Sequence, residues 1–137
     1  MSTRDATPGR EREKTEAGAL AVTVDDYMRA TEWRALARQR TMAAFGTFDF
    51  LATPTVGTTR KVIGEDTVET AEGRLPYRPV LSCFTALVNH LGCAAIAGPL
   101  PGGSPPPSLQ LIGAPWSEHR LLELARLLER EGVFQLP

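Results

Sequence analysis

Residues 79–97 have the sequence PVLSCFTALVNHLGCAAIA, which is the clearest pattern in the chain. Pro79 suits the first turn of a helix, where a backbone N–H has no intrahelical partner. Apolar side chains then recur at helical spacing, at Val80, Phe84, Leu87, Val88 and Leu91. Gly92 ends this helix, and the small residues Cys93–Ala97 predict a strand after it.

The segments that follow predict one more strand and one more helix. Gly and Pro dominate residues 98–107, which indicates a surface loop, and Ser108–Ile112 predicts a strand. Ser117 is a suitable N-cap for a final helix that ends near Gly132. One face of that helix carries Leu121, Leu124, Ala125 and Leu128.

The segments that precede residue 79 predict a long helix, a short strand and a loop. Thr23, followed by two aspartates, is a good start for a helix over Val24–Phe45 that ends at Gly46. One side of this helix carries mostly small residues, which indicates that the helix packs closely against something or runs along a larger body. The residues on that side are Tyr27, Ala30, Arg34, Ala37, Thr41 and Ala44. Phe48–Thr53, closed by Pro54, predicts a buried strand. Residues 55–76 have no sustained period and are expected to form a long loop with a binding or covering role.

Composition describes one ordinary domain, with 137 residues, 42% hydrophobic residues and a formal net charge of −1. Residues 1–20 are expected to form a flexible charged arm, and residues 21–137 a single α/β segment. The balanced charge argues against nucleic acid and anionic membranes as partners. No run approaches the ~20 apolar residues of a membrane helix, and no secretory signal is evident. We therefore expect a cytoplasmic protein.

No residue pattern points to a metal, a cofactor or a nucleophile. Cys83, His90, Cys93 and His119 could bind a metal, but their spacing does not match structural zinc sites, so we expect two reduced, buried thiols. A Cys–His nucleophile is disfavoured because no basic group lies near either cysteine in sequence. The Gly98–Gly103 stretch lacks the Lys-Ser/Thr of a phosphate loop and fits a hairpin-like connection. Asp49 should be paired or capping if it is buried.

Three ordered blocks resemble the C-terminal region of the amidase signature family. They are Asp49–Thr55 (DFLATPT), Thr85–Ala95 (TALVNHLGCAA) and Ser108–Gly113 (SLQLIG), the last of which precedes a leucine-rich helix. The resemblance covers roughly Val22–Gly132. It departs from the family at Ala94, where the family usually has proline.

The resemblance implies amide C–N bond hydrolysis, which the family performs with two serines and a lysine in an N-terminal Gly/Ser-rich segment. These 137 residues contain no such segment, and their only lysines are Lys14 and Lys61. We therefore carry over no catalytic residue. The implied fold is the C-terminal part of the amidase signature fold, an α/β piece with a few short strands of a mixed sheet packed with three helices. Its loops would form part of the wall of a substrate pocket, with four candidate residues: Thr53, Pro54, Thr55 and Asn89.

Three functions follow as expectations. The first is a C-terminal fragment or truncated form of an amidase, inactive alone, whose partner is the missing N-terminal part. The second is a non-catalytic interaction module that binds another chain, or a second copy of itself, through an exposed sheet edge and helix. The third is a split enzyme in which a separate polypeptide supplies the serines.

Overall fold

The computed structural model describes residues 18, 21–58 and 62–135. The chain divides into two compact units, Met1–Leu36 and Ala37–Pro137, which are described separately. Apart from Gly18, the predicted arm over residues 1–20 lies outside the described residues. The prediction of a single segment over residues 21–137 stays a prediction.

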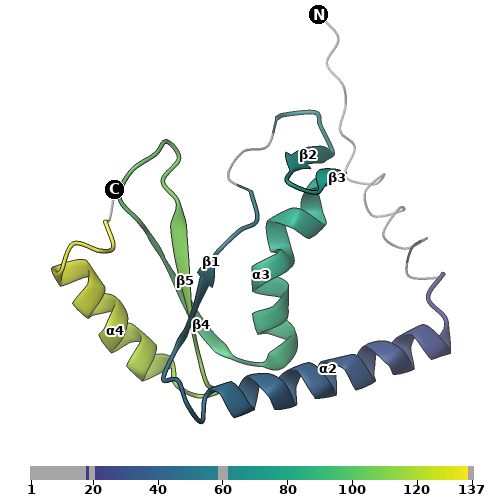
Figure 1. The fold of residues 1–137 in the computed structure, drawn as a ribbon, viewed down its shortest axis with the longest axis horizontal. Coiled ribbons are helices and arrows are strands. Elements are labelled where there is room, and N and C mark those ends of the chain that lie inside the picture. The colour runs from purple at the N-terminus through teal and green to yellow at the C-terminus, as the bar shows by residue number, and fades with distance from the viewer. Residues whose placement is uncertain (1–17, 19–20, 59–61, 136–137) are drawn as a thin grey trace, which may run out of the picture. The chain divides into compact units, whose positions relative to one another are not determined.

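The long helix α2 spans Val24–Ala44, which confirms the predicted helix to within one residue (Figure 1). Its residues 24–36 belong to the first unit. None of its residues is fully buried. On the side with small residues, Ala37, Thr41 and Ala44 are half-buried, and the Arg38 guanidinium donates a hydrogen bond to Leu91 O.

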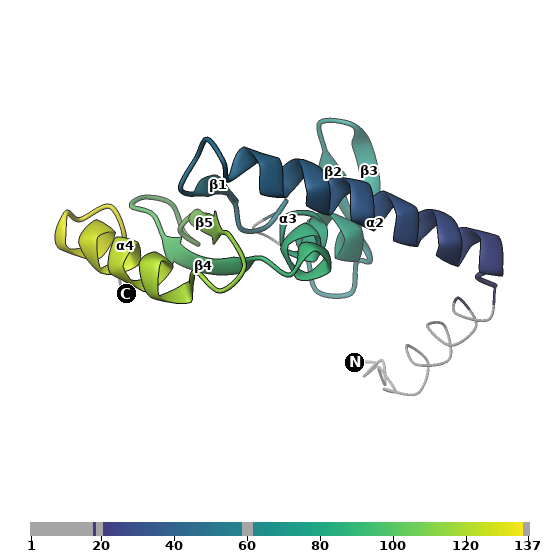
Figure 2. The ribbon, with the colours of Figure 1, turned by 90° about the horizontal axis from the view of Figure 1, so that it is seen from below.

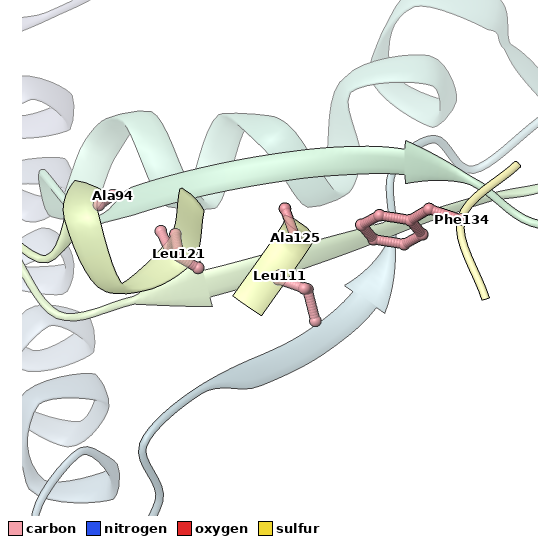
Figure 3. Packing of buried hydrophobic residues seen from close by; sticks show 5 residues of the cluster. All are labelled: Ala94, Leu111, Leu121, Ala125 and Phe134. Carbon is pink, nitrogen blue, oxygen red and sulfur yellow. The ribbon is translucent and has the colours of Figure 1, made fainter. Parts of the chain in front are cut away.

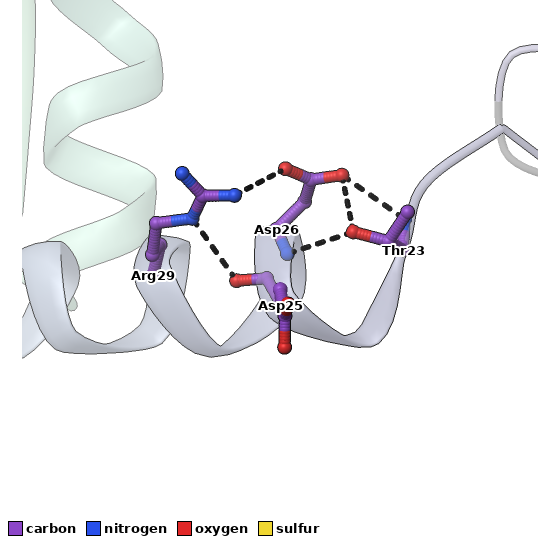
Figure 4. Close-up of polar contacts among 4 residues, drawn as sticks. All are labelled: Thr23, Asp25, Asp26 and Arg29. Carbon is purple, nitrogen blue, oxygen red and sulfur yellow. Dashed lines mark hydrogen bonds and ion pairs between the residues drawn. The ribbon is translucent and has the colours of Figure 1, made fainter.

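A reciprocal cap starts α2 (Figure 4). The Thr23 hydroxyl accepts a hydrogen bond from the Asp26 backbone N–H at 3.1 Å, and the Asp26 carboxylate accepts one from the Thr23 backbone N–H at 3.1 Å. The Thr23 hydroxyl also donates to the same carboxylate at 2.6 Å. This is a capping box with Asp in the position usually held by Glu or Gln, and it satisfies two backbone donors of the exposed helix end.

The second unit is built on a three-stranded antiparallel sheet in the order β1-β5-β4. The strands are β1 Leu51–Pro54, β4 Ala94–Pro99 and β5 Ser108–Gly113. In the register, Leu111 of the central strand lies opposite Ala52 and Ile96. Three strands occur where strands were predicted, and the hairpin-like connection between β4 and β5 is confirmed over residues 100–107. The buried strand predicted over Phe48–Thr53 is corrected, since β1 begins at Leu51, includes Pro54 and has no buried residue. Gly98 and Pro99, however, were predicted as loop and belong to β4.

Both edge strands contain a proline, and the hydrogen-bond pattern explains why each is tolerated. Neighbouring residues of an antiparallel strand direct their backbone groups to opposite sides. Since the Thr55 N–H donates to Ser108 O at 3.2 Å, the nitrogen of Pro54 faces away from β5. The Leu100 N–H likewise donates to Pro107 O at 2.8 Å, so Pro99 faces outward. Neither proline removes a bond from the sheet.

Helix α4, Glu118–Arg130, packs on β4 and β5 and forms the core of this unit (Figures 1 and 3). The core cluster consists of Ala94, Leu111, Leu121, Ala125 and Phe134. Ser117 takes the N-cap position as predicted, but its hydroxyl donates to Ala114 O at 2.6 Å instead of capping the helix, because its φ of −100° and ψ of 20° do not present it to the first turn.

Helix α3 spans Tyr77–Leu91, and Gly92 ends it in the left-handed conformation, with φ 66°. The helix begins two residues before Pro79, since Pro76 takes the N-cap position. The predicted loop over residues 55–76 contains an antiparallel hairpin, β2 Thr67–Thr70 and β3 Gly73–Pro76, which contacts α3 (Figure 2). The strands are short and polar, so no apolar alternation marked them in the sequence.

Candidate functional site

The turn Thr53–Thr55, at the end of β1, is tied to the central strand of the sheet. The half-buried Thr53 hydroxyl accepts a hydrogen bond from the Gln110 side-chain amide at 3.1 Å, and Gln110 is only 4% exposed. Together with the bond from the Thr55 N–H to Ser108 O, this contact fixes the turn. Pro54, between them, is exposed.

Thr55 carries an unsatisfied hydroxyl. Its Oγ1 is buried and makes no hydrogen bond within the described residues. A buried hydroxyl without a partner costs free energy, so most such groups in folded proteins are paired. The turn therefore offers one polar atom that a further chain segment or a ligand can satisfy.

Asn89 lies on the last turn of α3, and its side chain is exposed. No hydrogen bond joins Asn89 to the turn Thr53–Thr55 in the part of the chain that the structure describes. Three of the four candidate residues therefore lie at the end of β1 and the fourth on α3, and whether all four face one substrate stays a prediction.

A cavity of about 710 Å³ lies between the β2–β3 hairpin and α3, and sequence reasoning missed it because the hairpin itself was missed. It is open to solvent and lined by Gly57, Thr70, Ala71, Glu72, Leu75, Pro76, Pro79, Val80, Cys83 and Phe84. Only glycine fits at position 57 without a shift, because a Cβ there would collide with the backbone oxygen of Val80. None of the four candidate site residues lines this cavity.

The two cysteines are free, but the prediction that both are buried is wrong for Cys83, which is exposed. The amphipathic helix α3 buries Val88 and Leu91 instead, so the apolar neighbours of Cys83 in sequence did not imply burial. Cys93 is half-buried. Burial raises the pKa of the Cys93 thiol, and the positive charge of Arg38 partly opposes that rise.

Asp49 is exposed, so the condition on which pairing was expected is not met, although the residue does have a partner. Its carboxylate accepts a hydrogen bond from the Arg120 guanidinium at 2.6 Å, and that guanidinium also lies 5.3 Å from the centre of the Phe50 ring. The pair connects α4 to the segment before β1, which is a structural role.

Within residues 18, 21–58 and 62–135, no group of three or more His, Cys, Asp or Glu side chains is placed to hold a metal ion. Among the helices described, none is long and apolar enough to cross a membrane.

Known proteins match most of the chain. The family model described as Amidase matches residues 6–122. The chain is 33% identical over 113 residues to the 1-carboxybiuret hydrolase subunit AtzE of Pseudomonas sp. strain ADP, a match that covers 80% of this chain and 25% of that protein. It is 32% identical over 110 residues to a fatty acid amide hydrolase of Medicago truncatula, which covers 79% of this chain and 18% of that enzyme.

A solved structure, described as a vestigial protein complex that reveals the evolutionary origins of an s-triazine catabolic enzyme, has the same fold. It superposes with a TM-score of 0.79 at 31% identity, which covers 88% of this chain and 27% of that one. The 137 residues therefore span about a quarter or less of the length of these relatives.

Proposed function

Because the chain belongs to the amidase family, we propose that these 137 residues form the C-terminal part of an amidase and are not catalytic by themselves. The observation that carries the proposal is the continuous match over residues 6–122, set against the small share of each relative that it covers. In this proposal the reaction is hydrolysis of an amide C–N bond, and the nucleophile comes from residues outside the 137.

The chemistry of amide hydrolysis supports this assignment. Acyl transfer needs a nucleophile beside a base and donors that stabilise the developing oxyanion. The only lysines of the sequence, Lys14 and Lys61, lie in none of the three blocks that resemble the family, and neither lies in a Gly/Ser-rich segment. We assign no catalytic role to any of the 137 residues.

In the proposed role, the second unit supplies strands and part of the substrate pocket wall. Thr53, Pro54, Thr55 and Asn89 remain the proposed wall residues. The buried, unpaired Thr55 hydroxyl favours this, because such a group gains a partner when the missing part of the enzyme or its substrate is present.

A chimera tests the proposal. The matched 110 residues of the Medicago truncatula fatty acid amide hydrolase are replaced by the corresponding segment of this chain, and hydrolysis of a fatty acid amide is measured. The chimera is expected to hydrolyse the amide, whereas the isolated 137-residue chain and the host enzyme without the segment are expected to be inactive. Amide turnover by the isolated chain, abolished by changing one of its own residues, would refute the proposal.

An interaction module that binds another chain is the second candidate, and the relatives favour it to a degree because one of them is named as a subunit. A homo-oligomer joined through a sheet edge has less support. Both edge strands contain a proline, and the β4 edge already accepts a hydrogen bond from the Gln135 N–H at Pro99 O, at 3.0 Å. Sedimentation of the isolated chain tests the homo-oligomer, since a discrete dimer would favour it and a monomer would count against it. The two free thiols suit our proposal of a reducing, cytoplasmic location.

A further inference from the structure

Helix α2 exposes large apolar side chains along residues 24–36, all within the first unit. The exposed fractions are 78% for Val24, 66% for Tyr27, 52% for Met28, 58% for Trp33 and 46% for Leu36. We call these five residues the α2 surface. Single exposed apolar residues are ordinary, but two aromatic and three aliphatic ones within thirteen positions of one helix form a concentration that usually marks an interface.

The α2 surface extends around more than one side of the helix. Nine positions, or about two and a half turns, separate Val24 from Trp33, so these two side chains point in opposite directions. Leu36 lies between them, while Tyr27 and Met28 flank Val24. A flat partner can cover one side of such a helix, but only a body that surrounds it can cover both.

The composition of α2 also fits a buried environment. Protein interfaces are enriched in Tyr, Trp, Met and Arg and depleted in Lys. The 21 residues of α2 contain no lysine but four arginines, Arg29, Arg34, Arg38 and Arg40. Two of its acidic residues, Asp25 and Asp26, lie in the first turn, where they oppose the positive end of the helix dipole.

From these observations we infer that the α2 surface is the contact through which this chain is enclosed by the remaining part of an amidase fold. The match over residues 6–122 includes the whole of α2, and the relatives contain about three times as much further chain that could enclose it. Residues 1–17 of this chain are a poor alternative, since they contain no large apolar residue other than Met1. The inference rests on the proposed function and adds to it the surface on which the partner binds.

The fluorescence of Trp33 reports on the inference directly. The emission of Trp33 is obtained by subtracting the spectrum of the Trp33→Phe variant from the spectrum of the unsubstituted protein. This subtraction is made for the isolated chain and for the fatty acid amide hydrolase chimera. We expect emission typical of indole in water from the isolated chain. In the chimera we expect a shift to shorter wavelength and loss of acrylamide quenching, because the ring is then covered.

Charge substitutions supply the second measurement. Tyr27→Arg and Trp33→Arg should each reduce the soluble, active chimera by about tenfold, because each buries an unpaired charge. The same variants should leave the helical signal of the isolated chain unchanged, since both side chains are exposed there. Gln39→Arg adds the same charge at an exposed polar position of α2 and serves as the matched control.

The outcomes separate the inference from the proposed function. If the unsubstituted chimera fails to accumulate or to hydrolyse the amide, the proposed function is wrong and the inference falls with it. An active chimera in which Trp33 stays exposed to water, or which tolerates both arginine variants as well as Gln39→Arg, overturns the inference alone. If Trp33 is already covered in the isolated chain, and its coverage rises with protein concentration, a second copy of the chain covers the α2 surface. That result also overturns the inference.

Discussion

Thr23 and Asp26 show how two side chains can determine where a long exposed helix begins. Each satisfies a backbone N–H of the other, and Arg29 adds an ion pair to the Asp26 carboxylate at 3.4 Å. The hydrogen bond from the Thr23 hydroxyl is the main reason that the pKa of Asp26 lies below its ordinary value of 3.8. Because α2 has no buried residue, its stability depends more on such local contacts than that of a packed helix does.

The lowered pKa of Asp26 predicts a pH dependence for α2. A carboxylate whose pKa is lower in the folded state stabilises that state above its unfolded pKa, and the stabilisation is lost as the pH falls through the folded pKa. Helical circular dichroism should therefore decline below about pH 4, and Asp26→Asn should remove that part of the decline while lowering helicity at pH 7. Asp25→Asn is the control, since the Asp25 side chain takes no part in the cap (Figure 4). An identical acid profile for all three proteins would contradict the capping role.

At the scale of elements, Gly98 of β4 is where the strand and the C-terminal segment meet. A Cβ at this position would collide with the ring of Phe134, which belongs to the core cluster. The Gln135 N–H bonds to Pro99 O immediately beside it. The absence of a side chain at Gly98 therefore lets the aromatic ring approach the strand closely.

Gly98→Ala should lower the free energy of unfolding by about 1–3 kcal/mol, because the added methyl group displaces the Phe134 ring from a packed core. Urea unfolding measures the change. In a Phe134→Ala background the same substitution should cost little, since the ring that it strikes has gone. Equal costs in the two backgrounds would show that the methyl group acts on something other than Phe134.

The sequence predicted those elements that have a strong period or a clear stop signal. Helix α3 follows from its apolar spacing and Gly92, and α2 from Thr23 and Gly46. The hairpin β2–β3 could not be predicted, because its four-residue strands are polar and half-exposed. The cavity beside it was missed for the same reason. Pro99 was predicted to lie in a loop because composition does not show whether the backbone nitrogen of a proline would face the neighbouring strand or point away from it.

At the scale of the whole molecule, burial of apolar residues is uneven. Among the described residues they are Val88, Leu91, Ala94, Leu111, Ile112, Leu121, Ala125 and Phe134, all within the second unit. The sequence predicted the length of α2 correctly, but burial depends on what lies beside a helix, which its own pattern does not contain. The candidate wall residues Thr53, Pro54, Thr55 and Asn89 came from the family resemblance, because no periodicity or spacing in the sequence marks a pocket wall.

This uneven burial predicts an uneven stability within the isolated chain. Backbone amides of β5 and α4 should exchange hydrogen most slowly, because opening them exposes the core cluster. Amides of α2 over residues 24–36 should exchange almost as fast as those of an isolated helix, since no buried contact opposes their opening. Native-state hydrogen exchange with peptide-level mass spectrometry measures both, with the chimera as the comparison.

Protection should rise in α2 far more than in α4 when the rest of the enzyme is present. Protection of α2 equal to that of α4 in the isolated chain would mean that the helix already has a partner, and the α2 surface would not be free for the remainder of an amidase.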